Sequence, residues 1–282
     1  MERFTTSDGL SLAYADEGDG PPLLCLPGLT RNGEDFAPVV ARFGPERRVI
    51  RLDPRGRGAS DHDPDPLNYN VAVEARDALE LMDHLGLARV PVLGTSRGGL
   101  LAMVIGAAAP QRLAGVLFND VGPVLEPGGI ARILDYLGRV PPYADFDAAA
   151  LALEAASRDR FPGVTVAAWR VHAARIWREV PGGLALRYDP RLHESFEAGM
   201  KALEPGAPLP DMWPLFDALP IVPLALLRGA NSGLISPATA EAMAARRPDL
   251  VVTVVADRGH VPFLDEPEAV AAIAAFLARV AA

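Results

Sequence analysis

The sequence has very little cysteine: Cys25, in the apolar run PLLCLPG, is the single one among 282 residues. No disulfide can form within the chain, and we expect this thiol at a buried strand position. Long hydrophobic runs are also missing, because the best candidate, residues 100–109, is interrupted by Gly106 and is shorter than the roughly 20 apolar residues of a membrane span. The opening MERFTTSDGL lacks the apolar core of a signal peptide. We therefore predict a cytoplasmic protein with no membrane partner.

Clustered positive charge is scarce as well, since the formal net charge is −9 and the Lys and Arg residues are scattered. Nucleic-acid binding requires a basic patch facing the phosphates, so we exclude a nucleic-acid partner. Apolar residues, in contrast, make up 50% of the chain, enough for the core of one large domain or two small ones. The composition predicts a globular protein and leaves its oligomeric state open.

Strand-like and helix-like segments alternate through the first part of the chain. After short strands in residues 4–28, the patterns predict helices at 35–44, 70–87 and 98–109 and strands at 47–53, 90–94 and 113–120. Such alternation favours right-handed crossovers, and continuous apolar strands suit a sheet that is covered on both faces. We predict an α/β fold with a mostly parallel eight-stranded sheet flanked by helices, and with antiparallel pairing possible at its start.

The alternation stops between residues 121 and 219, where we find helical patterns without convincing strands, among them residues 165–180. It resumes with the strands 221–229 and 250–257 and a closing helix. The simplest organisation is a core domain of residues 1–121 and 219–282, with a helical insertion of residues 122–218 after the sixth strand.

The segment Gly94-Thr95-Ser96-Arg97-Gly98 matches the G-x-S-x-G pattern and lies between a predicted strand and a predicted helix. In that context the serine takes strained backbone angles, and the two glycines avoid collisions with the adjoining elements. An isolated match is usually no more than a tight turn, and a phosphate loop fails because neither G-x-G-x-x-G nor a Lys-Ser/Thr pair is present. Ser96 is therefore a candidate nucleophile.

A serine nucleophile needs a base, and the chain has five histidines. His62 lies in a polar loop, His84 and His172 have helical surroundings, and His193 is in the insertion. His260 directly follows the final predicted strand, which makes it the candidate base.

At this point the chain resembles the α/β-hydrolase superfamily over nearly its full length. The resemblance rests on LPGLTRN, RLDPRGRGASD, GTSRGG, LRGANSGLIS and GHVPFLDEP, each of which follows a predicted strand. It implies that Ser96 is the nucleophile, that His260 is the general base and that the insertion is a helical cap domain. The backbone N–H groups of Leu29 and Arg97 would then form the oxyanion hole.

The acid of the expected triad departs from the superfamily pattern. Most relatives carry an aspartate after the seventh strand, and the matching position here is Gly233. We predict that Asp120 replaces it, since it ends the sixth strand and some superfamily members carry their acid there. Asp120 could otherwise only cap a turn, and Asp257 is close to His260 in sequence but is expected to point elsewhere.

Asp53 and Asp61 suggest a metal site only weakly. The resemblance makes them loop-bracing residues beside Arg55 and Arg57, and no group of His, Asp and Glu has metal-ligand spacing. We predict neither a metal nor a cofactor.

The predicted activity is that of a serine hydrolase acting through an acyl-enzyme on a small to medium, largely apolar ester, lactone or thioester. The same residues would serve a carbon–carbon bond hydrolase or a cofactor-free perhydrolase. The alternative from another functional class is a degenerate hydrolase-fold protein that binds a small ligand without efficient turnover. The missing acid at Gly233 motivates this alternative. Six aromatic residues of the insertion could line a pocket, although their helical spacing favours core packing for most of them; they are Tyr136, Tyr143, Trp169, Trp177, Trp213 and Phe216.

Overall fold

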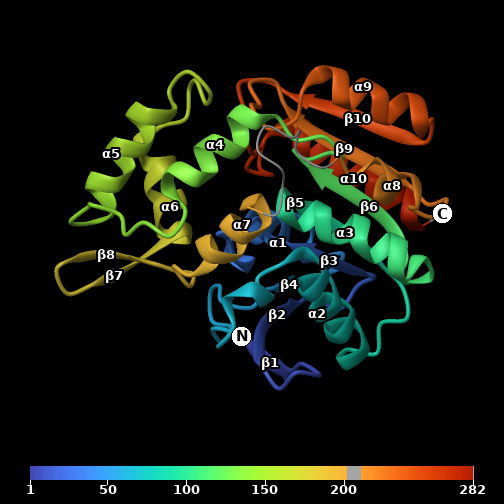
Figure 1. Cartoon of the computed structure of the whole chain (residues 1–282). Helices are drawn as coiled ribbons and strands as arrows, with labels where there is room; N and C mark the ends of the chain where they lie inside the picture. The colour runs from blue at the N-terminus through green and yellow to red at the C-terminus, as the bar shows by residue number, and fades with distance from the viewer. Residues whose placement is uncertain (202–210, 282) are drawn as a thin grey trace.

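The computed structural model describes residues 1–201 and 211–281, and its centre is one eight-stranded sheet (Figure 1). The strands lie in the order β1-β2-β4-β3-β5-β6-β9-β10. β1 and β2 and then β2 and β4 pair antiparallel, and the other neighbours pair parallel. The predicted mostly parallel eight-stranded sheet is confirmed. The strands span Glu2–Thr5, Ser11–Glu17, Pro22–Leu26, Arg48–Leu52, Val90–Thr95, Leu113–Asn119, Leu224–Gly229 and Leu250–Val255 in chain order.

Helices cover both faces of the sheet and bury two separate apolar clusters against it. One face carries α1 (Ala37–Phe43) and α10 (Pro267–Ala281). Their apolar side chains pack on the strand residues that point to this face of the sheet. The other face carries α2 (Val71–His84), α3 (Arg97–Ala108) and α9 (Pro237–Arg246). Because both faces are covered, β5 is buried at every position, which explains its continuous apolar sequence.

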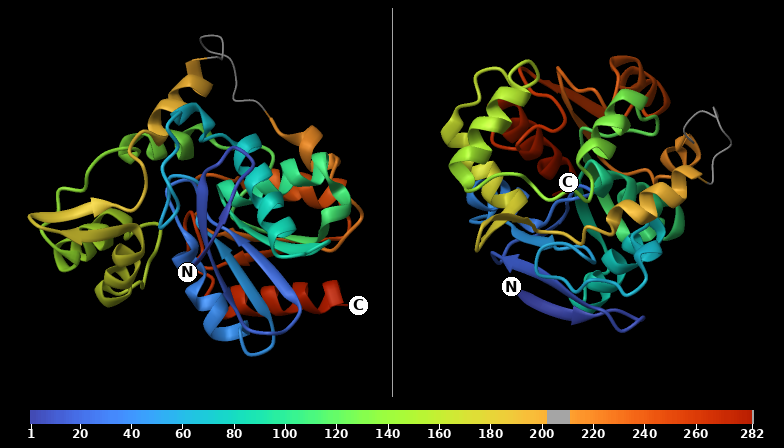
Figure 2. Two further views of the ribbon diagram at one scale, coloured as in Figure 1. Left: turned by 90° about the horizontal axis from the view of Figure 1, so that it is seen from below. Right: turned by 60° about the vertical axis from the view of Figure 1, so that its left-hand side comes forward.

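Between β6 and β9 the chain forms a group of helices that stands largely to one side of the sheet (Figures 1 and 2). The group comprises α4 (Pro127–Tyr136), α5 (Phe146–Ser157), α6 (Val166–Ile176), α7 (Leu192–Lys201) and α8 (Trp213–Asp217). The short α8 packs back on the main core, where Phe216 is fully buried against Phe118. Three 3₁₀ turns at Gly33–Phe36, Pro66–Asn68 and Pro110–Arg112 complete the described elements. No helix in the described ranges is long and apolar enough to cross a membrane.

This segment corrects one sequence prediction, because it contains strands. The helix expected over residues 165–180 ends at Ile176, and Trp177–Val180 (β7) pairs antiparallel with Gly183–Leu186 (β8). The physical reason is the turn at Gly182 and Gly183, both at positive φ, which reverses the chain and lets the short flanking segments pair.

Candidate active site

Ser96 lies at the sharp turn between β5 and α3, with φ 51° and ψ −116°. A non-glycine residue with positive φ is strained, and such strain is typical of a nucleophile held at the top of a sheet. The glycines on either side leave the necessary room. A Cβ atom at Gly94 would lie 2.5 Å from the backbone of Gly98, and one at Gly98 would lie 1.9 Å from the carbonyl oxygen of Leu26.

The structure brings Ser96, His260 and Asp120 into one hydrogen-bonded chain. His260 Nε2 lies 2.9 Å from Ser96 Oγ, and His260 Nδ1 lies 2.7 Å from Asp120 Oδ2. Solvent exposure decreases from the histidine to the aspartate: the His260 side chain is 23% exposed and the Asp120 side chain is 0% exposed. The serine and imidazole can thus reach a substrate, while the carboxylate is shielded from water.

Two further groups fix the carboxylate of Asp120. Its Oδ1 accepts a 2.8 Å hydrogen bond from the N–H of Gly229, and its Oδ2 accepts a 2.7 Å bond from the hydroxyl of Ser232 as well as facing His260. The sequence analysis did not predict this role for Ser232. A serine beside the usual acid position was the available signal.

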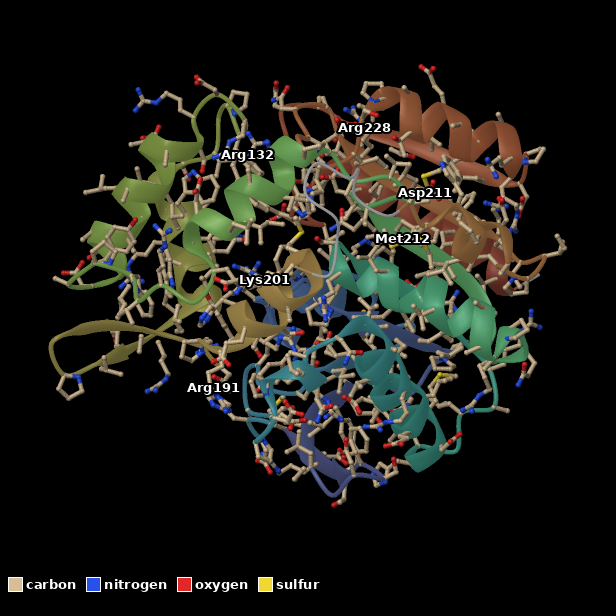
Figure 3. The ribbon with its side chains drawn as sticks, viewed as in Figure 1. Arg132, Arg191, Lys201, Asp211, Met212 and Arg228 are labelled. Atoms are coloured by element: carbon tan, nitrogen blue, oxygen red, sulfur yellow. The ribbon has the colours of Figure 1, made fainter. Side chains whose placement is uncertain are left out.

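At Gly233, the position where the usual acid was expected, the space next to the backbone is occupied by another side chain. Arg132 extends from α4 (Figure 3). Its guanidinium lies beside Gly233, with Nη2 1.9 Å from where a Cβ atom would be. Any larger residue at 233 must displace Arg132. The acid position after β9 is therefore filled by a cation, and the carboxylate comes from the end of β6.

The remaining candidates lie in other settings. Asp257 is exposed, and no hydrogen bond joins it to His260 within the described residues. Asp53 braces two loops, accepting from the N–H groups of Gly33 at 2.7 Å and Ala59 at 2.8 Å. Asp61 pairs with Arg3 on the surface.

The other histidines are each held in place by packing or by a local contact. His62 lies 3.6 Å from Asp189, and His84 packs on Phe4 and Tyr14. His193 Nδ1 lies 2.8 Å from the carbonyl oxygen of Pro190.

The predicted oxyanion donors flank Ser96. Arg97 is the first residue of α3, so its N–H has no acceptor within the helix. Leu29 belongs to the loop after β3, and a Cβ atom added at the preceding Gly28 would lie 3.7 Å from Ser96 Cβ. The loop backbone thus runs close to the nucleophile. Arg31 in this loop forms a structural salt bridge, with Nε 2.7 Å from Asp35 Oδ2.

Most aromatic residues of the segment between β6 and β9 are packed as the sequence pattern favours. Trp169 is buried against Phe161 and Phe263, while Tyr143 packs on Trp177. Tyr136 on α4 is the exception, since it is 50% exposed.

His172 on α6 packs on Phe263, with ring centroids 4.7 Å apart. Burial, with the nearby charges of Arg31 and Arg175 adding to it, holds the pKa of His172 well below its ordinary value of 6.5. His172 is therefore neutral at pH 7.

A hollow of about 690 Å³ lies apart from these residues, between the β7–β8 hairpin and the loop after β4. Asp53, His62, Leu186 and Arg187 are among its lining residues, and Ser96, His260 and Asp120 are not. This hollow is therefore separate from the space next to Ser96.

A model of the alpha/beta hydrolase family matches residues 23–273, and the chain belongs to this family. A crystal structure of an alpha/beta hydrolase from Novosphingobium aromaticivorans shares 42% identity and superposes with a TM-score of 0.90, covering 99% of this chain and 97% of that one. These matches show an enzyme of the hydrolase class with this fold.

Two curated relatives have named activities. The chain is 33% identical over 268 residues to a 3-hydroxybutyrate-oligomer hydrolase of Cupriavidus necator, an alignment that covers 92% of this chain and 90% of the relative. It is 27% identical over 252 residues to a 2-(acetamidomethylene)succinate hydrolase of Mesorhizobium japonicum, covering 89% and 85%. The two names differ in the compound that is hydrolysed.

Proposed function

We propose that this protein is a serine carboxylic ester hydrolase that works through an acyl-enzyme on small to medium esters. The observation that carries the proposal is the unbroken chain of hydrogen bonds from Ser96 through His260 to Asp120. In this arrangement His260 Nε2 takes the proton of the serine hydroxyl while Asp120 stabilises the imidazolium that forms.

The first half of the reaction begins when Ser96 Oγ attacks the ester carbonyl. The oxygen of the tetrahedral intermediate lies against the N–H groups of Leu29 and Arg97, and the positive end of the α3 dipole adds to their effect. His260 then returns its proton to the leaving alcohol, leaving the acyl group on Ser96. In the second half, His260 removes a proton from water as the water attacks the acyl carbonyl. It then returns this proton to Ser96 Oγ as the ester bond to the serine breaks and the acid leaves.

The relative with 33% identity favours an ester of a hydroxy acid as substrate, because the units of a 3-hydroxybutyrate oligomer are joined by ester bonds. The proposed substrate keeps the largely apolar acyl chain that the sequence predicts. Lactones and thioesters present the same carbonyl to Ser96 and belong in the same substrate panel.

A fluorophosphonate probe and a panel of esters test the proposal together. Wild type should be labelled with one probe per chain and should hydrolyse 4-nitrophenyl butyrate or a 3-hydroxybutyrate dimer, whereas Ser96→Ala should do neither while remaining folded. Folded wild type that takes up no probe would favour a ligand-binding protein instead. Labelling without turnover of any ester, lactone or thioester would redirect the search to carbon–carbon bond cleavage or perhydrolysis.

A further inference from the structure

A buried side chain on α2 connects the loop after β3 with the start of α3, the two segments that supply the proposed oxyanion donors. The first connection runs through Arg57, whose side chain is fully buried. Its Nε donates a 2.8 Å hydrogen bond to the carbonyl oxygen of Leu29, and its Nη1 donates a 2.8 Å bond to Glu74 Oε1. The loop that carries Leu29 N–H is thereby tied to α2.

The second connection runs through Arg97, the residue after the nucleophile. Its Nε donates to Glu74 Oε2 at 2.7 Å, and its Nη2 donates to Glu74 Oε1 at 3.0 Å. Both oxygens of one carboxylate are thus engaged by the fork of Arg97, and Oε1 also holds Arg57.

The environment of Glu74 makes these contacts strong. Its side chain is 1% exposed, so water does not compete for the carboxylate. Burial alone would raise the pKa of Glu74, but the charges of Arg57 and Arg97 and their hydrogen bonds outweigh it, and the pKa lies below its usual range. An ionised carboxylate between two guanidinium groups is a rigid charge-assisted junction.

We propose that Glu74 is a positioning residue for catalysis: it sets the spacing of the Leu29 and Arg97 backbone donors by holding the loop of one and the side chain of the other. Glu74 does not face the substrate, and it acts on the transition state through Arg57 and Arg97. The inference rests on the proposed function, since it assumes that an oxyanion forms between these two N–H groups. Preorganised donors favour the transition state over the bound ester, so the spacing affects kcat more than KM.

The substitution Glu74→Gln tests this directly. A glutamine has the same shape, but one of its two terminal atoms is an amide nitrogen that must face an arginine donor, so one of the two connections is lost. The matched control is Asp77→Asn, one turn further along α2. Asp77 is also 1% exposed and pairs with the fully buried Arg55 at 2.6 Å, and it contacts neither Leu29 nor Arg97.

Both substitutions remove a buried ionic contact and leave a buried guanidinium without its full set of carboxylate partners. Both variants should therefore unfold at a lower temperature than wild type. Only Glu74→Gln should lower kcat for 4-nitrophenyl butyrate, by roughly 10- to 100-fold at a KM within about 2-fold of wild type, since removing one oxyanion donor outright costs about 10²–10³. It should also weaken inhibition by phenylboronic acid, whose tetrahedral adduct on Ser96 places an oxygen between the two donors. These readouts are taken at a temperature where each variant is folded.

Equal kcat values for Glu74→Gln and Asp77→Asn would overturn the proposal. If Glu74→Gln does not fold, Arg97→Met supplies the test, because it keeps the backbone N–H of residue 97 and the Glu74–Arg57 pair. It removes the second connection together with the 3.0 Å hydrogen bond from Arg97 Nη2 to the carbonyl oxygen of Tyr69. Wild-type kcat and boronate affinity in Arg97→Met would then refute the role of Glu74. Failure of wild type to hydrolyse any ester would instead refute the proposed function, and the fluorophosphonate control identifies that case.

Discussion

Asp120→Asn changes one atom of the proposed triad, and the structure determines which way the new amide must face. The N–H of Gly229 is a fixed backbone donor at 2.8 Å from Oδ1, so the amide oxygen has to take that position. The NH₂ group then lies at the Oδ2 position, opposite Ser232 and His260. The serine hydroxyl can rotate and accept from it. His260 Nδ1 must also become an acceptor, which moves the imidazole proton to Nε2.

An imidazole with its proton on Nε2 cannot remove the proton of Ser96. In serine hydrolases this tautomer error lowers kcat by about 10⁴, which corresponds to about 5 kcal/mol of transition-state stabilisation. We expect the same loss of 4-nitrophenyl butyrate turnover in Asp120→Asn, with an unfolding temperature close to wild type because the side chain keeps its shape. Turnover within 10-fold of wild type in a correctly folded variant would refute Asp120 as the acid.

Three other changes probe the surroundings of the triad. Ser232→Ala removes one hydrogen bond to an ionised carboxylate and should lower kcat by about 10-fold, since such bonds contribute about 1.5–3 kcal/mol; unchanged kcat would show that Gly229 alone positions Asp120. Gly98→Ala puts a Cβ 1.9 Å from a backbone oxygen and should destabilise the protein by about 1–3 kcal/mol or more in urea unfolding, whereas Gly128→Ala, with open space around it, should be neutral or stabilising. Because the pKa of His172 is lowered on folding, the unfolded chain binds the extra proton, so wild type should lose stability as the pH falls below about 6.5. His172→Asn should show a flatter pH dependence of the unfolding temperature there, and parallel curves would contradict that assignment.

The main sheet could be predicted from the sequence because its signals are local. Runs such as residues 90–94 are continuously apolar and end in glycine or proline, and β5 is indeed buried throughout. The β7–β8 hairpin was missed for a physical reason. Residues 177–180 continue the helical spacing of α6, and their pairing depends on a turn at Gly182 and Gly183 whose geometry composition alone does not specify.

In the candidate site, too, residues in local motifs could be predicted, whereas residues that act through distant contacts could not. Ser96 and His260 stand in short motifs beside strand ends, so the sequence was sufficient to place both at the sheet edge. The contacts of Ser232 and Glu74 could not be predicted, because they are made with other segments of the chain. Ser232 meets a residue 112 positions away, and Glu74 meets Arg57 in the loop after β4 and Arg97 at the start of α3. Only the folded backbone brings those partners together.

The topology explains how the proposed acid, Asp120, can come from the end of β6 rather than from the loop after β9. β6 lies between β5 and β9, with Asn119 in register with Thr95 on one side and with Leu227 on the other. Asp120, the next residue, therefore lies at the sheet edge between the serine turn and the loop after β9. From there its carboxylate reaches His260 and still receives the N–H of Gly229 and the hydroxyl of Ser232. The loop after β9 supplies donors to the carboxylate in place of the carboxylate itself, which is why Gly233 can lack a side chain without leaving His260 unpaired.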